Sequence, residues 1–134
     1  MSKSDYLENA VLDHVLGGSA LTQPAGQFVA LCVSAPSDAD TGATLPEITH
    51  TNGYARQSAT FAAAAAGATS NSNSIAFTAS GGSFSGIATH FAVLDSITDA
   101  AGNVLYHGAL NNARTFNDGD TGTFAAGDLD VTED

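Results

Sequence analysis

The sequence predicts an all-β fold: a single-domain antiparallel β-sandwich, jelly-roll or immunoglobulin-like, with a short N-terminal α-helix. Fourteen glycines, together with abundant Ser, Thr, Asn and Asp, indicate many tight turns. Apolar residues make up 43% of the 134-residue chain, which is enough for a packed core without disulfides. Short apolar segments recur between turn signals from about residue 27 to residue 132, as in a two-layer sandwich. We therefore expect one domain over residues 1–134.

The N-terminal segment predicts a helix over residues 4–16. Ser4 is a suitable N-cap, and Gly17-Gly18 is a suitable stop. An apolar stripe at helical spacing is formed by Leu7, Val11 and Val15. We expect this helix to close an open edge or end of the sandwich; the alternative is a helix that binds a partner.

The β-region divides into segments of strand-like pattern. They are Gln27–Ser34, Tyr54–Phe61, Ser74–Ala79, Ile87–Ile97, Val104–Leu110, Ala113–Phe116, Thr121–Ala125 and Leu129–Thr132. Gln27–Ser34 is apolar on both faces, which predicts a central buried strand. Ile87–Ile97 and Val104–Leu110 are predicted to form a hairpin. Spacing alone does not predict the order of strands in the sheets.

Two segments between the strands lack a strand pattern. Ala35–Gly53 is a long polar loop, of a length that is uncommon in compact domains and often functional. The run Ala62–Ala66 is interpreted as a loop, or as a strand continuation that packs close to another surface.

The charge balance restricts the partners. Three basic residues, Lys3, Arg56 and Arg114, stand against fourteen acidic ones, for a formal net charge of −11. Nucleic-acid binding needs clustered Lys and Arg, so direct contact with DNA or RNA is not expected, nor is docking on an anionic membrane. Such a negative charge is compatible with a protein that lies on the outer face of a particle filled with DNA.

Membrane insertion and secretion are not expected either. The longest apolar runs, Phe28–Val33 and Phe61–Ala66, are far shorter than the roughly 20 residues of a membrane span. Asp5, Glu8 and Asp13 interrupt the N-terminal segment, so we expect no secretory signal there.

No metal or cofactor site is predicted. The four histidines, His14, His50, His90 and His107, do not follow a metal-ligand spacing, and Cys32 is the only cysteine. Two Asp-rich turns, at Asp38–Asp40 and Asp118–Asp120, faintly resemble calcium loops but lack the glutamate that closes an EF-hand. We interpret them as solvated turns, with weak calcium binding as the alternative.

Catalytic motifs are not apparent, and we expect no enzyme activity. Ser83 and Ser85 lie near glycines, but Phe84 occupies the position that a nucleophile elbow gives to serine. Asp95, at the end of a long strand, is the one acid that merits attention as a general acid or base. Phosphate-binding glycine motifs do not occur.

The few basic residues and the strand histidines are the candidate contact residues. Arg56 and Arg114 lie in predicted strands, where an arginine needs a carboxylate partner or an interface; both readings remain open. His90 and His107 lie on strands that are predicted to pair, so they could lie near each other on one face of the sheet. The predicted contacts to another subunit or to a capsid are therefore Tyr54, Arg56, His90, His107 and Arg114.

Several segments in order resemble a family of small tailed-phage virion proteins, described as capsid decoration (cement) or tail-fibre-like proteins. The resemblance rests on residues 2–16 and on Gly53–Gln57, Thr89–Asp95, Leu105–Leu110 and Gly119–Leu129. It implies a β-sandwich on the outer capsid surface of the virion. There it would stabilise the assembled shell by binding the major capsid protein, often as a homotrimer.

Other functions remain in view beside capsid decoration. A protein associated with the tail or a fibre, with host-surface binding, is the first alternative. A carbohydrate-binding module is the second, disfavoured because the chain has no Trp and three Tyr.

Overall fold

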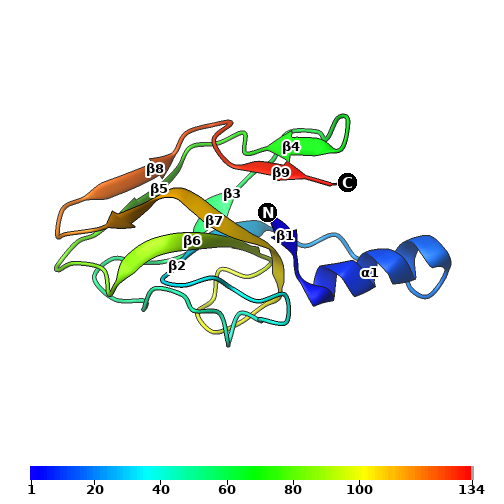
Figure 1. Cartoon of the computed structure of the whole chain (residues 1–134), viewed down its shortest axis with the longest axis horizontal. Helices are drawn as coiled ribbons and strands as arrows, with labels where there is room; N and C mark the ends of the chain where they lie inside the picture. Colours follow the sequence, from blue (N-terminus) through cyan, green and yellow to red (C-terminus); the bar gives the residue numbers. More distant parts are fainter. Residues whose placement is uncertain (134) are drawn as a thin grey trace.

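Two layers of antiparallel strands form the body of the molecule, seen in a computed structural model that describes residues 1–133 (Figure 1). One layer is a five-stranded sheet of order β1-β7-β6-β2-β3. The other holds two strand pairs, β4-β9 and β5-β8. The bounds are β1 Ser2–Lys3, β2 Gln27–Cys32, β3 Gln57–Ala59, β4 Ala68–Ser70, β5 Ile75–Thr78, β6 Ile87–Leu94, β7 Val104–Thr115, β8 Thr121–Phe124 and β9 Asp130–Thr132. The expected all-β sandwich is confirmed.

Strand β2 lies at the centre of the larger sheet, as its two-sided apolar pattern predicts. It pairs with β6 on one side and with β3 on the other. Its odd-numbered residues Val29 and Leu31 face the second layer, and its even-numbered residues Ala30 and Cys32 face the opposite side. All four are buried, because both faces of this strand are covered.

Each face of the sheet has its own apolar cluster. The main core lies between the two layers and contains an aromatic group in which Tyr54 stacks on Phe77 and meets Phe84 edge-on. The smaller cluster lies under the long loop 35–53, where Leu45 covers the small side chains of the central strands. The predicted loop is therefore a cover for one face of the sheet.

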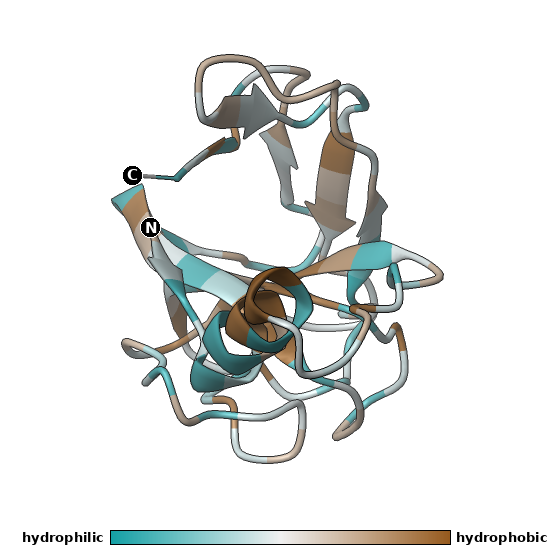
Figure 2. Ribbon diagram, turned by 90° about the vertical axis from the view of Figure 1, so that its right-hand side faces the viewer, coloured by the Kyte–Doolittle hydropathy of each residue, from teal (hydrophilic) through white to brown (hydrophobic). Residues whose placement is uncertain are grey.

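The N-terminal helix α1, Asp5–Leu16, has the predicted caps and part of the predicted packing. The Leu7 N–H donates to Ser4 Oγ, and Gly17 ends the helix with φ 99°. Leu7 is only 9% exposed, whereas Val15 is 69% and Leu16 78% exposed. Helix α1 contacts β7 near its start and then extends away from the sheets (Figure 1), and Figure 2 views it nearly end-on. The expectation that it closes an end of the sandwich holds for its first half, where Leu7 and Val11 pack against the main core, whereas its distal half covers no strand.

Several strand boundaries differ from the predicted ones. Of the predicted strand Tyr54–Phe61, Gln57–Ala59 pairs with β2 and Phe61 forms an isolated bridge to Asn71. Tyr54 lies outside the ladder, with its side chain in the core. The alanine run 62–66 is an exposed loop and not a closely packed segment, and Ala66 there has φ 51°. The predicted separate strand Ala113–Phe116 is mostly the end of β7. The remaining strands agree to within a few residues at their ends.

Strand β7 carries an irregularity that affects the surface. It pairs with β6 at His90–Ala109 and again at Ala88–Arg114, and the residues Leu110–Ala113 between these pairs have no register partner. Such a bulge bends a strand and releases its peptide groups from the ladder.

No helix in the described residues is long and apolar enough to cross a membrane.

Candidate interaction surface

Arg56 is the centre of a buried polar cluster and is 1% exposed. Its Nη2 lies 2.7 Å from Glu47 Oε2, and its Nε lies 3.1 Å from both carboxylate oxygens. The guanidinium also donates to backbone carbonyls of two loops, at Gly42, Ser96, Thr98 and Ala101. Of the two readings left open for this arginine, intramolecular pairing is the one observed. The pair fastens the loop 35–53 to the β6–β7 turn.

Tyr54 belongs to the same cluster. Its hydroxyl accepts from the Leu31 N–H and donates to Glu47 Oε1, both at 2.9 Å. Burial raises the pKa of the Tyr54 phenol, and the nearby charge of Glu47 raises it further. Tyr54 and Arg56 are therefore internal anchors, and another subunit has little access to either. Their predicted contact with a partner stays a prediction that this burial does not favour.

A possible cation-binding group lies at the edge of this cluster. Within the described residues, Glu47, His50 and Asp99 each offer a ligand atom within 4.8 Å of the others. Glu47, however, already accepts from Arg56, Tyr54 and His50. A metal ion would have to displace these bonds and leave the buried guanidinium without its counter-charge. The donor set therefore fits an ion-pair network better than a metal site.

The two strand histidines lie on one face of the sheet, as predicted, but they bind different partners. His107 Nε2 lies 2.8 Å from Asp38 Oδ1, and His90 Nδ1 lies 2.8 Å from Thr89 Oγ1. The hydrogen bond from His107, with a second one from Ser2, lowers the pKa of Asp38. His107 is buried and His90 half-buried. Neither histidine forms a joint site with the other.

Apart from Asp38, the acids at the ends of the Asp-rich turns, and Asp95, accept backbone N–H groups. Asp40 and Asp120 each accept the N–H three residues earlier, and Asp118 accepts the Gly81 N–H. Asp95 accepts both the backbone and the side-chain amide of Asn103. These contacts are those of turn-forming carboxylates. Their arrangement does not converge on a common point.

Arg114 is the predicted contact residue that the structure leaves on the surface. Its Nη2 donates to the Thr121 carbonyl at 2.6 Å, and its guanidinium lies 5.0 Å from the Phe116 ring centroid. Lys3 pairs with Glu133, and Arg56 pairs with Glu47. Arg114 is thus the one Lys or Arg of the described chain without a carboxylate partner.

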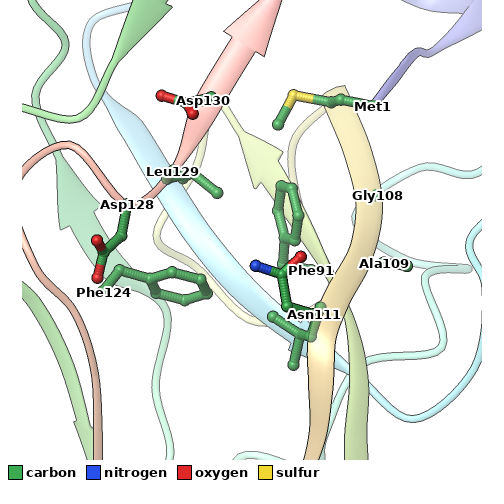
Figure 3. Close-up of a pocket in the computed structure, with 10 residues that line it drawn as sticks. Met1, Phe91, Gly108, Ala109, Asn111, Phe124, Asp128, Leu129 and Asp130 are labelled. Atoms are coloured by element: carbon green, nitrogen blue, oxygen red, sulfur yellow. The ribbon is translucent and has the colours of Figure 1, made fainter.

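A groove runs beside Arg114, between the bulged part of β7 and strand β8. One recess of about 130 Å³ lies at the Arg114 end, and a second of about 240 Å³ lies at the other end; Leu110 and Phe124 line both. The second recess has an apolar floor that includes Phe91 and Leu129. Figure 3 shows the side chains of Phe91, Phe124 and Leu129 turned toward the space. Phe91 and Leu129 are themselves buried, so the apolar side chains that the groove leaves partly accessible are Leu110 and Phe124.

The polar side chains around the second recess are acidic or amide groups. Asp128, Asp130 and Asn111 line it (Figure 3). Asp128 Oδ2 accepts the Ala125 N–H, which fixes its position on the turn before β9. The groove therefore has carboxylates at one end and a guanidinium at the other.

The distal part of α1 is the second exposed apolar feature. Leu12, Val15 and Leu16 are largely exposed within two turns of the helix end. Clustered exposed aliphatic side chains on a highly charged protein are typical of a contact surface. With the groove, they make the outside of this sandwich an interaction surface.

A rigid sandwich with a saturated polar interior and exposed contact features is typical of a structural protein. A family model described as podophage GP4 fiber I protein gp80 matches residues 2–132. The chain belongs to this family of phage fibre-type structural proteins. A comparison with curated proteins found no match.

Sequence reasoning missed the groove and its acidic end. Asp128 and Asp130 follow a turn signal and read as solvated turn residues, and their proximity to β7 depends on how the layers stack. A local signal for the free edge did exist: the consecutive Asn111 and Asn112 are poor strand formers and interrupt the pattern of β7.

Proposed function

We propose that the chain is a fibre-associated structural protein of a phage tail, which works by holding neighbouring virion proteins together. The observation that carries this proposal is the match of residues 2–132 to a fibre protein family. The interior supports it, because the buried Arg56–Glu47 pair fastens two loops to each other and so keeps the body of the protein in one shape. The proposal assigns the chain no reaction.

The exposed end of α1 supports an attachment role. The helix packs against the core through Leu7 and Val11 in its first two turns, and Leu12, Val15 and Leu16 beyond them are exposed. Apolar side chains of this kind supply contact energy when a partner covers them, at about 25 cal/mol per Å² of buried apolar surface. The partner in this proposal is another virion protein, and the sandwich is the body that it holds.

The experiment that tests the proposal locates the protein in the particle. Antibodies against the recombinant chain are bound to purified phage and seen by electron microscopy with gold labels. Label confined to the tail or its fibres supports the proposal. Label distributed over the capsid surface refutes it in favour of capsid decoration, and absence of label from intact and from opened particles refutes both.

A further inference from the structure

The outer edge of β7 is open over most of its length. Strand β1 pairs with β7 only at Tyr106 and His107, and the other strands of the described chain leave this edge unpaired beyond that point. The bulged residues Leu110–Ala113 also have no register partner on β6. Asn111, Asn112, Ala113 and Arg114 are exposed. The peptide groups of this segment are therefore accessible to a strand from outside.

This edge has one of the devices that usually protect an open strand, the bulge at Leu110–Ala113, and lacks the others. Proteins block such edges with bulges, lysine, proline, inward-pointing charges or a covering loop. The segment Ala109–Ala113 is Ala-Leu-Asn-Asn-Ala and carries no charge, in a chain with a net charge of −11. An uncharged open edge on an acidic protein is the surface where a second acidic molecule meets the least repulsion.

The groove beside this edge is charged in opposite senses at its two ends. Arg114 lies at one end of the segment. Ala109, at the other end, lines the recess that also holds Asp128 and Asp130. A second copy that approaches antiparallel brings its own Arg114 to the acidic end of the first. The same motion brings the first copy's Arg114 to the acidic end of the second.

We propose that two copies of this chain join edge to edge through antiparallel pairing of Leu110–Arg114 about a two-fold axis at Asn112. Asn112 then lies opposite itself, and Arg114 of each copy lies opposite Leu110 of the other, which lines the recess that holds Asp128 and Asp130. A two-fold contact must be self-complementary, and this segment meets that condition because opposite charges lie at its two ends. The pairing joins the two five-stranded sheets into one.

Charge favours a second copy over other occupants. A purely basic segment would meet Arg114 at one end of the groove, and a purely acidic segment would meet Asp128 and Asp130 at the other. The end of α1 from another copy carries Asp13, which would lie close to the acidic end. Only an occupant with both charges, spaced like those of the groove itself, satisfies both ends at once.

The first experiment measures the mass of the full chain by size-exclusion chromatography with light scattering over a range of concentrations. We expect a monomer–dimer equilibrium. Arg114→Glu places like charges at both contacts, and we expect it to weaken dimerisation by about tenfold or more. A strictly monomeric or a trimeric wild-type chain overturns the proposal, because an edge-to-edge two-fold contact closes at two copies.

Charge reversal on the opposite side supplies the matched control. The double variant Asp128→Lys with Asp130→Lys should also weaken the dimer. A mixture of this variant with Arg114→Glu should form mixed dimers, since each contact then pairs opposite charges. Circular dichroism checks that each variant is folded. Failure of the mixture to associate, with both variants folded, contradicts the assigned contact.

The backbone part of the proposal has its own test. Asn112→Pro removes an N–H that has no register partner in the single chain, so the fold should persist while the dimer is lost. Hydrogen exchange should show protection of the amides of residues 110–113 that rises with concentration. If Leu16→Ser abolishes the dimer and Asn112→Pro leaves it intact, the contact lies on α1, and the edge pairing is refuted.

Discussion

Replacing Glu47 with glutamine tests the buried ion pair most directly. Glutamine has nearly the same volume, so the change removes the charge without opening a cavity. Arg56, at 1% exposure, is then a buried cation whose remaining partners are backbone carbonyls and an amide. Removing one member of a buried pair costs about 3–5 kcal/mol, because the remaining charge is neither solvated nor neutralised.

This loss is large for a chain of this size. Domains unfold with free energies of about 5–15 kcal/mol, so the substitution removes a substantial part of the total. With a urea dependence of about 2 kcal/mol per molar, a loss of about 4 kcal/mol lowers the unfolding midpoint by about 2 M. The substitution should lower the urea concentration at the unfolding midpoint and leave the dependence of the unfolding free energy on urea unchanged.

The matched control is Glu133→Gln, which breaks the surface pair with Lys3. The Lys3 Nζ to Glu133 Oε2 distance is 2.8 Å, but both side chains are partly exposed. Surface pairs of this kind contribute about 0–1 kcal/mol. Urea unfolding followed by circular dichroism measures both variants. If Glu47→Gln loses no more stability than Glu133→Gln, the reasoning about the buried cluster is wrong.

Three further predictions concern other parts of the fold. Gly42→Ala should destabilise by about 1–3 kcal/mol in thermal unfolding, because a Cβ there would lie 1.9 Å from the Ala101 carbonyl oxygen. The hydrogen bond from His107 lowers the pKa of Asp38, so it contributes stability at neutral pH that is lost as pH falls through that pKa. In the Asp38→Asn variant, the free energy of unfolding should therefore fall less steeply below about pH 4 than it does in the wild type. Burial raises the pKa of the Cys32 thiol to about 12, so a thiol reagent at pH 8 should label unfolded and not native protein.

Local signals predicted the helix ends and the central strand because local residues determine them. Ser4 and Gly17 act on the backbone of α1 directly, and the apolar residues of β2 need cover on both faces wherever they lie. Which face of α1 is covered depends on the rest of the fold. The stripe through Val15 predicted contact where the structure has none, because no strand extends that far along the helix.

The role of Arg56 shows why a site composed of distant segments escapes prediction. Its carboxylate partner Glu47 lies in the long loop, which has no periodic pattern to place it. The carbonyls that it binds belong to the β6–β7 turn and to Gly42, more than ten residues away in the chain. Sequence reasoning required a partner for this arginine but had no means of choosing between an internal carboxylate and another subunit.

The buried polar groups and the exposed contact features of the molecule have different roles in the proposals made above. Within the described residues, every buried side-chain nitrogen and oxygen has a hydrogen-bond partner. The two contacts proposed above lie on the outside, at the end of α1 and at the open edge of β7. Because α1 and the β7 edge lie on different parts of the sandwich, a copy held by its edge still presents its helix. If both contacts form, edge pairing links copies and the helix attaches the pair to another virion protein; a variant that loses one contact should therefore retain the other.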